Sequence, residues 1–156
     1  KKEVIAKGEI TIKDTVEYKH LVPNTEYVIK GTLMDKSTGK PFKVKGKEIT
    51  STVKFVPDRT DGKVEVTFTF DGSAIKKDTE LVVFETLYRD GVELTAHADI
   101  NDDGQTVTVK PYIPHNPKTG DDRNINRILG IAGASLVGIA GCVYFFIKRK
   151  KKGGQR

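Results

Sequence analysis

The sequence predicts an all-β domain, an immunoglobulin-like β-sandwich, followed by a linker and one C-terminal transmembrane helix. Two observations predict the sandwich: seven short segments rich in β-branched and aromatic residues, and clear turn signals between them. A third observation, an apolar run without charged residues near the C-terminus, predicts the helix. The chain therefore divides into a domain at 1–112, a linker at 113–127, a membrane span at 128–147 and a basic tail at 148–156.

The seven predicted strands lie within the first 112 residues. Residues 64–70 read Val-Glu-Val-Thr-Phe-Thr-Phe, and this strict alternation is the period of a half-buried strand. Asp90-Gly91, between two such segments, indicates a tight hairpin. The predicted strands are 9–18, 26–33, 49–55, 63–70, 79–88, 92–98 and 105–112.

The net charge of +6 is located at the C-terminal end of the chain. Residues 1–112 hold 18 Lys and Arg against 19 Asp and Glu, a net charge of −1, whereas the linker adds +1 and the tail adds +6. The predicted domain is therefore nearly neutral, and the basic composition gives no support to nucleic-acid binding.

The segment around the apolar run has a recognisable layout. Lys and Arg resist translocation, so the basic tail marks the cytoplasmic side and the domain is expected outside the cell. A Pro-x-Thr-Gly motif, an apolar span and a basic stop resemble a Gram-positive cell-wall sorting signal of the LPXTG type, with Asn116 where leucine is commonest. The motif is formed by Asn116, Pro117, Lys118, Thr119 and Gly120.

This resemblance implies that a sortase cuts between Thr119 and Gly120 and joins Thr119 to a peptidoglycan precursor. The alternative is a plain single-pass membrane anchor. Cys142, the only cysteine, lies inside the span, so no internal disulfide is expected. Because translocation needs a signal peptide and none precedes Lys1, we expect the chain to be the C-terminal piece of a longer protein.

Polar residues in phase with an apolar face are the informative exceptions in a sandwich. Asp35, Glu85 and Gln105 each fall in phase with the apolar residues of their predicted strands, so each is expected to point toward the core. Thr15 is out of phase with its apolar neighbours. It turns inward only if a bulge intervenes near Asp14.

The segment Val82-Val83-Phe84-Glu85 has the V-[AV]-F-E pattern of VaFE-repeat surface proteins, and several other segments resemble the same family in the same order. The resemblance implies a domain cross-linked by a Thr–Gln ester bond. It implies that Thr15 bonds to Gln105 and that Asp35, Glu85 and His97 assist the reaction. The other matching segments are 14–18, 31–35, 61–68, 97–102 and 105–107.

The expected chemistry can also be argued from the residues. A neutral His97 imidazole can take the proton of a threonine hydroxyl, and two neighbouring carboxyls, Asp35 and Glu85, can share one proton and donate it to the Gln105 amide. The product is an ester and one ammonia. The event is a single turnover, so the domain is not expected to be an enzyme in the usual sense, and it needs no cofactor.

Four other readings compete with this one. Residues 99–104 match the first half of a calcium-binding loop, but Lys110 stands at the position of the bidentate Glu, so no metal is expected and a turn explains the cluster better. A Lys–Asn isopeptide domain is disfavoured by Gln105. The stalk of a wall-anchored surface protein, an adhesin or pilus component, is the preferred function; the alternatives are a module for an unknown host ligand and a wall-anchored enzyme.

Overall fold

The computed structural model describes residues 2–114 and 135–146, and these residues form strands and short 3₁₀ turns. The all-β prediction is confirmed for this part of the chain. The 3₁₀ turns are η1 (Gly72–Ala74) and η2 (Asp103–Gln105). The strands are β1 (Lys2–Ala6), β2 (Glu9–Lys19), β3 (Tyr27–Asp35), β4 (Lys40–Pro41), β5 (Lys43–Val44), β6 (Lys47–Glu48), β7 (Thr50–Phe55), β8 (Gly62–Asp71), β9 (Thr79–Arg89), β10 (Val92–His97), β11 (Thr106–Pro111) and β12 (Ser135–Phe146).

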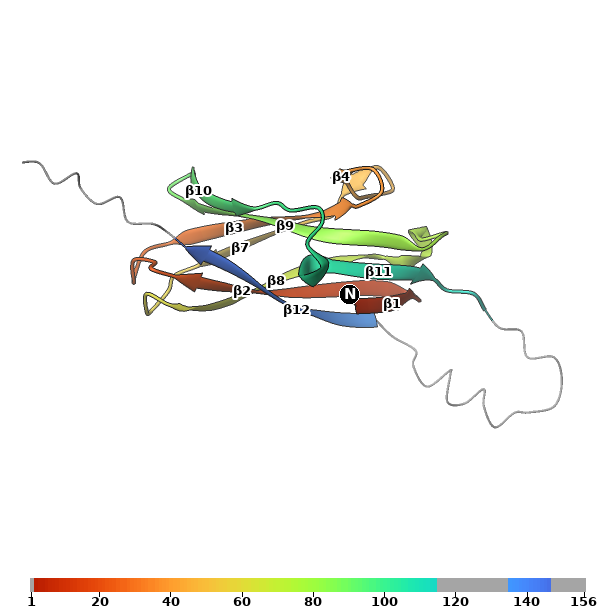
Figure 1. Cartoon of the computed structure of the whole chain (residues 1–156), viewed down its shortest axis with the longest axis horizontal. Helices are drawn as coiled ribbons and strands as arrows, with labels where there is room; N and C mark the ends of the chain where they lie inside the picture. The colour runs from red at the N-terminus through yellow and green to blue at the C-terminus, as the bar shows by residue number, and fades with distance from the viewer. Residues whose placement is uncertain (1, 115–134, 147–156) are drawn as a thin grey trace, which may run out of the picture.

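The strands form two main layers (Figure 1). One sheet has the order β1-β11-β9-β3-β4, with β10 also paired to β9 and β7 also paired to β3. The other sheet has the order β12-β2-β8, and β5 and β6 form a small separate hairpin. Strand β3 occupies one edge of β9 along residues 81–88. The other edge of β9 pairs with β11 along residues 79–82 and with β10 along residues 85–89.

The core lies between the two sheets and follows the alternation of the sequence. In β2 every second residue is buried, from Ile10 to Tyr18, and β8 contributes Val66, Phe68 and Phe70. The opposite sheet contributes the buried side chains Ile29, Leu33, Leu81, Val83, Leu87, Val107 and Val109. Each fully buried aliphatic or aromatic side chain of this kind contributes about 1.5–3 kcal/mol relative to an exposed one.

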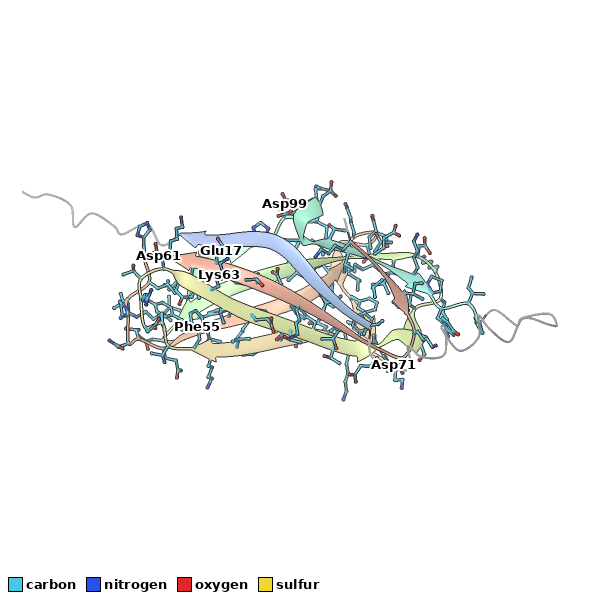
Figure 2. All side chains as sticks on the ribbon, turned by 90° about the horizontal axis from the view of Figure 1, so that it is seen from below. Glu17, Phe55, Asp61, Lys63, Asp71 and Asp99 are labelled. Carbon is cyan, nitrogen blue, oxygen red and sulfur yellow. The ribbon has the colours of Figure 1, made fainter. Side chains whose placement is uncertain are left out.

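The outer face of the β2–β8 pair is polar. Glu17 lies directly opposite Lys63, and the two side chains form an ion pair of 2.9 Å on this face (Figure 2). Lys13 and Glu65 form a second pair at 3.2 Å. The odd-numbered residues of β2 from Glu9 to Lys19 therefore face away from the core.

The seven predicted strands agree with β2, β3, β7, β8, β9, β10 and β11 to within two residues at each end. The prediction missed β1 and the two-residue strands β4, β5 and β6. Strand β1 is held by parallel pairing with β11, about a hundred positions further along the chain. Such long-range pairing leaves little local signal in a five-residue segment.

The predicted transmembrane helix is not observed in the part of residues 128–147 that the structure describes. Residues 135–146 form strand β12, which pairs in parallel with β2, and none of the described residues forms a helix long and apolar enough to cross a bilayer. An uninterrupted apolar run suits a buried strand as well as a helix, and β2 provides hydrogen-bond partners along one edge of β12. The linker motif 116–120 and the basic tail lie outside the described residues.

Gly72 should not tolerate a side chain. Its N–H donates to the Gly8 carbonyl at 2.8 Å, and a Cβ at this position would lie 2.7 Å from that oxygen and 3.0 Å from the carbonyl carbon of Ala6. Both atoms belong to backbone, so we expect Gly72→Ala to lower the free energy of unfolding by about 1–3 kcal/mol. Denaturant titration measures this. The control is Ala74→Ser at an exposed position of the same turn, and equal stability of the two variants would contradict the packing argument.

Candidate functional site

Three polar side chains come together inside the sandwich, and we call them the buried centre: Asp14, Glu85 and Gln105. They are 0%, 1% and 1% exposed. They come from β2, β9 and η2, so the centre joins both sheets and the loop that precedes β11. Polar groups buried this completely are costly unless their interactions with one another compensate.

Asp14 faces the core because β2 is regular. It is in phase with the buried residues Ile12 and Val16, and the pairing of β2 with β8 runs from Glu9 to Tyr18 without a break in register. A carboxyl group therefore occupies a position that the alternation reserves for an apolar side chain.

Glu85 reaches the centre from the opposite sheet. Its neighbours across the ladder are Gly31 in β3 and His97 in β10. A Cβ on Gly31 would lie 2.5 Å from Cζ of Phe68, so this glycine makes room for the aromatic ring of the facing sheet. The result is close packing of the two sheets beside Glu85.

Gln105 is positioned by the loop between β10 and β11. Asp102 caps η2: its Oδ1 accepts the backbone N–H of Gly104 at 2.8 Å and that of Gln105 at 3.3 Å. Strand β11 then begins opposite Val82 of β9, just past the point where β10 ends. The Gln105 side chain thus enters the core where the edge of β9 changes partner.

His97 lies at the border of the centre. Its side chain is 31% exposed, and because it pairs with Glu85 on a neighbouring antiparallel strand, the two side chains lie on the same face of the sheet. The Nε2 atom lies 2.8 Å from Oδ2 of Asp102. The ring is also close enough to Asp14 for its charge to lower the pKa of that carboxyl.

The electrostatics of the centre favour a shared proton. Burial, then the negative charge and hydrogen bonding of Asp14, raise the pKa of Glu85 to about 9. Burial raises the pKa of Asp14 to about 6, against smaller opposing effects of Glu85, Gln105, the Thr15 backbone and His97. None of the four carboxyl oxygens accepts a hydrogen bond of ordinary geometry from a donor of the described residues. Two carboxyls can bond to each other only when one is protonated, so we assign the proton at neutral pH to Glu85.

The structure does not bring Thr15 to the buried centre. Thr15 is exposed and lies on the polar face with Lys13 and Glu17, opposite Glu65 of β8. The bulge that would have turned it inward is absent from β2 along its pairing with β8. The buried polar side chains of the described residues include one threonine, Thr106, whose Oγ1 donates to the carbonyl of Asp102 at 2.6 Å.

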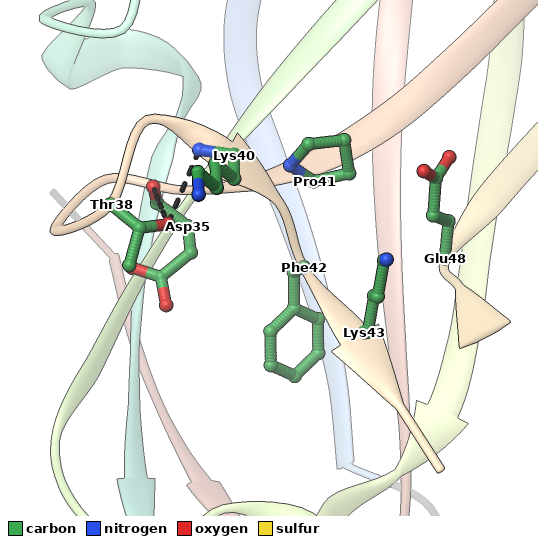
Figure 3. A pocket seen from close by; sticks show the side chains of 7 residues that line it. All are labelled: Asp35, Thr38, Lys40, Pro41, Phe42, Lys43 and Glu48. Carbon is green, nitrogen blue, oxygen red and sulfur yellow. Dashed lines mark hydrogen bonds between the residues drawn. The ribbon is translucent and has the colours of Figure 1, made fainter. Parts of the chain in front are cut away.

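The structure does not bring Asp35 to the buried centre either. Asp35 is the last residue of β3 and is only half-buried; its Oδ1 accepts the N–H and the hydroxyl of Ser37 at 2.9 and 2.6 Å. It lines a surface hollow with Thr38 and Lys40, away from the buried centre (Figure 3). The strand ends in a turn here, so an inward phase no longer implies an inward side chain.

Sequence reasoning missed Asp14, although the signal was present. Asp14 is in phase with four apolar residues of β2, whereas Thr15 needed an extra bulge to reach the core. As expected, Glu85 lies near Gln105 and His97. The second carboxyl of the group is that of Asp14, where Asp35 was predicted. The cluster at 99–103 forms turns, in which Asp99 and Asp102 accept backbone N–H groups, and no group of three candidate metal ligands occurs in the described residues.

Comparison with known proteins gives one family. The family described as "TQ: T-Q ester bond containing domain" matches residues 1–109. No curated protein gives a significant match.

Among solved structures, the chain is similar to a bacterial adhesin from Mobiluncus mulieris containing intramolecular disulfide, isopeptide and ester bond cross-links, in two crystal forms. The TM-score is 0.57 at 18% identity, over 72% of this chain and 54% of the adhesin chain. The match therefore spans about half of the adhesin chain and supports the fold. An alternative pilotin from the type II secretion system of Vibrio cholerae gives a TM-score of 0.39 at 17% identity, over 67% of this chain and 99% of that one.

The buried carboxyls should make stability depend on pH. Folding raises the pKa of Glu85 from 4.5 to about 9 and that of Asp14 from 3.8 to about 6, so the folded state binds more protons than the unfolded state. Their stabilising contribution is present in full below about pH 4 and is lost as pH rises through the pKa values of the folded state. The free energy of unfolding then falls by at most about 1.4 kcal/mol per pH unit for each proton released. We expect the denaturation midpoint to fall between pH 5 and pH 9.

The variant Glu85→Gln should flatten this dependence, because the amide cannot lose a proton. Glu65→Gln, on the exposed face, is the matched control and should keep the slope of the parent. If Glu85→Gln and the parent lose stability equally between pH 5 and pH 9, the assignment of the proton to Glu85 is wrong.

Proposed function

Since the chain belongs to the family of T-Q ester bond containing domains, we propose that its buried centre forms an intramolecular ester between a threonine hydroxyl and the Gln105 side chain. The observation that supports this most directly is the burial of Gln105 beside Asp14 and Glu85, with His97 at the border of the centre. Each of the four side chains has a role in that reaction, and none is required by the packing of an ordinary sandwich.

In this proposal the protonated carboxyl of Glu85 and its partner Asp14 polarise the Gln105 amide. Negative charge develops on the amide oxygen as the hydroxyl attacks, and a neutral carboxyl can donate a hydrogen bond to it in a site from which water is excluded. His97 takes the hydroxyl proton and returns it to the leaving nitrogen as ammonia departs. The reaction occurs once per molecule, so the domain modifies itself and has no turnover.

In this proposal the hydroxyl belongs to a residue on a strand along the free edge of β2. Thr15 is exposed on the polar face, and β8 covers one edge of β2. In the structure β12 occupies the free edge, where its Ile139 pairs with Asp14 and its backbone passes close to η2. A residue of a strand in this place is next to both Asp14 and the turn that carries Gln105.

The function of such a domain is structural. We propose that it is the stalk of a surface protein of adhesin or pilus type, with an immunoglobulin-like fold, a covalent cross-link in place of disulfides, and no metal or cofactor. The likeness to a cross-linked adhesin supports the fold of this proposal. The alternative is that the domain itself binds a host ligand on a plain single-pass membrane anchor.

We further propose that a sortase attaches the protein to the Gram-positive cell wall. The support is the sequence: the motif Asn116–Gly120, the apolar run after it and the basic tail. Before cleavage the run would insert into the membrane as a helix, since a bilayer removes the water that would otherwise solvate its backbone. After cleavage Thr119 would carry the link to peptidoglycan.

The ester should be visible as a mass deficit. In the full-length gene product we expect the mass of one ammonia to be missing from the parent and from Thr15→Ala, and the full calculated mass in Gln105→Ala. Mapping of the cross-linked peptide pair by mass spectrometry would identify the threonine that Gln105 binds. A folded parent with its full calculated mass would overturn the ester, and specific binding of a matrix protein would then favour the ligand-binding alternative.

Wall attachment should depend on Thr119. In a Gram-positive host, protein released by digestion of the wall should end at Thr119 and carry a peptidoglycan fragment, and Thr119→Ala should leave the protein in the membrane fraction. Lys118→Ala changes the variable position of the motif and serves as the control, which should still reach the wall. Recovery of the parent only from membranes, with its basic tail intact, would indicate the plain anchor.

A further inference from the structure

We propose that a lysine patch at one end of the sandwich docks the domain on a bilayer that contains anionic phospholipids, in the state in which the apolar run 128–147 is inserted in that bilayer. The inference rests on the proposed membrane anchor and adds a partner for the domain itself. The lysine patch is formed by Lys40, Lys43, Lys45, Lys47, Lys76 and Lys77.

The domain is nearly neutral as a whole, but its charges are unevenly distributed. Residues 36–47 hold five lysines and residues 72–77 hold two, and neither segment holds an acidic residue. The loops 20–26 and 56–61 hold three acidic residues and one arginine. These loops lie at the opposite end of β8 from the lysine patch, as the positions of Asp61 and Asp71 show (Figure 2). One end of the sandwich is therefore positive and the other negative.

The fold brings the two lysine-containing segments together. The rings of Phe42 and Phe70 lie 5.3 Å apart, which holds the β5–β6 hairpin beside the end of β8. Nζ of Lys45 lies 3.9 Å from Oδ2 of Asp71, the N-cap of η1. Hydrogen bonds from Ser73, then the charges of Lys45 and Lys76, lower the pKa of Asp71, so lysines from both segments lie near this carboxylate.

The lysines of the patch are accessible to an external anion. All six are exposed, and within the part of the chain that the structure describes, Lys45 is the one member that forms an ion pair. That pair is long, and 82% of the Lys45 side chain is exposed. Its partner Asp71 already accepts the backbone N–H of Ser73 at 2.9 Å. The charges of the patch are therefore only partly neutralised within the domain.

The turn of the β5–β6 hairpin supports a role for charge at this place. Lys45 and Gly46 have φ values of 51° and 80°, the left-handed conformation that a tight hairpin requires. Glycine, asparagine and aspartate adopt this conformation readily, whereas lysine is strained in it. Backbone strain of this kind is concentrated at functional positions. Here it places a positive charge at the tip of an exposed hairpin.

The position of the patch favours the bilayer as its partner. Val109 of β11 pairs with Thr79, directly after the loop 72–78, so β11 ends beside the patch. The 15 residues from 113 to 127 then lead to the apolar run, and such a length spans at most about 50 Å. The linker thus keeps the patch at a high effective concentration next to the lipid headgroups. Each lysine that reaches an anionic surface strengthens binding by about fivefold.

Docking has a consequence for the proposed sorting reaction. The linker would be held at the bilayer through both of its ends, so the motif 116–120 would stay near the membrane surface until it is cleaved. A basic patch without an inserted anchor binds a bilayer weakly and reversibly. Cleavage after Thr119 would therefore also release the domain from the lipid surface.

The test uses the full-length gene product in vesicles of phosphatidylcholine with or without phosphatidylglycerol. Cys142→Ser removes the native thiol, and Ala74→Cys, at an exposed position beside the patch, carries a donor dye for energy transfer to labelled headgroups. We expect more energy transfer in the anionic vesicles. The difference should vanish in about 1 M salt, where charges more than about 3 Å apart are screened.

Two variants of equal net charge locate the interaction. The combined replacement Lys43→Gln, Lys45→Gln and Lys47→Gln should lower the ratio of docked to undocked protein by about a hundredfold. The control Lys30→Gln, Lys54→Gln and Arg59→Gln removes the same charge from exposed positions outside the patch and should dock like the parent. Equal energy transfer in neutral and anionic vesicles, or equal losses in the two variants, would refute the docking.

The remaining outcomes separate the patch from the anchor. Tighter binding of the parent to soluble polyphosphate than to anionic vesicles would identify a soluble polyanion as the partner and overturn the bilayer. If the apolar run does not insert into vesicles of either kind, the proposed anchor fails. Sedimentation of the same protein with anionic vesicles then tests the patch alone: binding of the parent and the control but not of the patch variant supports it, and equal binding of all three refutes it.

Discussion

The burial of two carboxyl groups against each other is the constraint on which the rest of this domain depends. Asp14 and Glu85 come from opposite sheets, and the fully buried side chains of the described residues include no Lys or Arg. A pair of this kind persists in a core only by retaining a proton, and a retained proton makes one carboxyl a hydrogen-bond donor. The proton that this burial requires is therefore the same proton that, in the proposed reaction, lets the centre polarise the Gln105 amide. Close packing, such as the approach of Phe68 to Gly31, leaves little room for water that could solvate the two carboxyl groups.

The change of partner along β9 allows Gln105, a residue of the loop between β10 and β11, to reach the core between the two sheets. Strand β10 pairs with the later part of β9 and β11 with its earlier part, and the chain between them leaves the sheet and returns. Gln105 sits at the point of return. Its side chain can enter the core there because the loop supplies its own hydrogen bonds through the cap of Asp102, and the backbone rejoins the ladder at Thr106.

Much of this fold was accessible from the sequence, since alternation and turn residues are local signals. The same alternation placed Glu85 and Gln105 correctly. It failed at Asp35, where the strand ends and the side chain accepts hydrogen bonds in a turn. At Thr15 the family resemblance and the phase of β2 point to opposite faces of the strand. Asp14 had the better phase. The short strands, the parallel pairings of β1 and β12, and the contact between His97 and Asp102 depend on tertiary geometry that no short window of sequence contains.

The parallel pairing of β1 with β11 has a mechanical meaning. The two strands run in the same direction, with Lys2 opposite Val107 and Ala6 opposite Pro111. Tension that pulls the beginning of β1 and the end of β11 apart acts along both strands in opposite directions. The hydrogen bonds between them are then loaded together in shear, rather than one after another by peeling. A domain held in this way should resist extension through the whole length of the pair before any single bond yields.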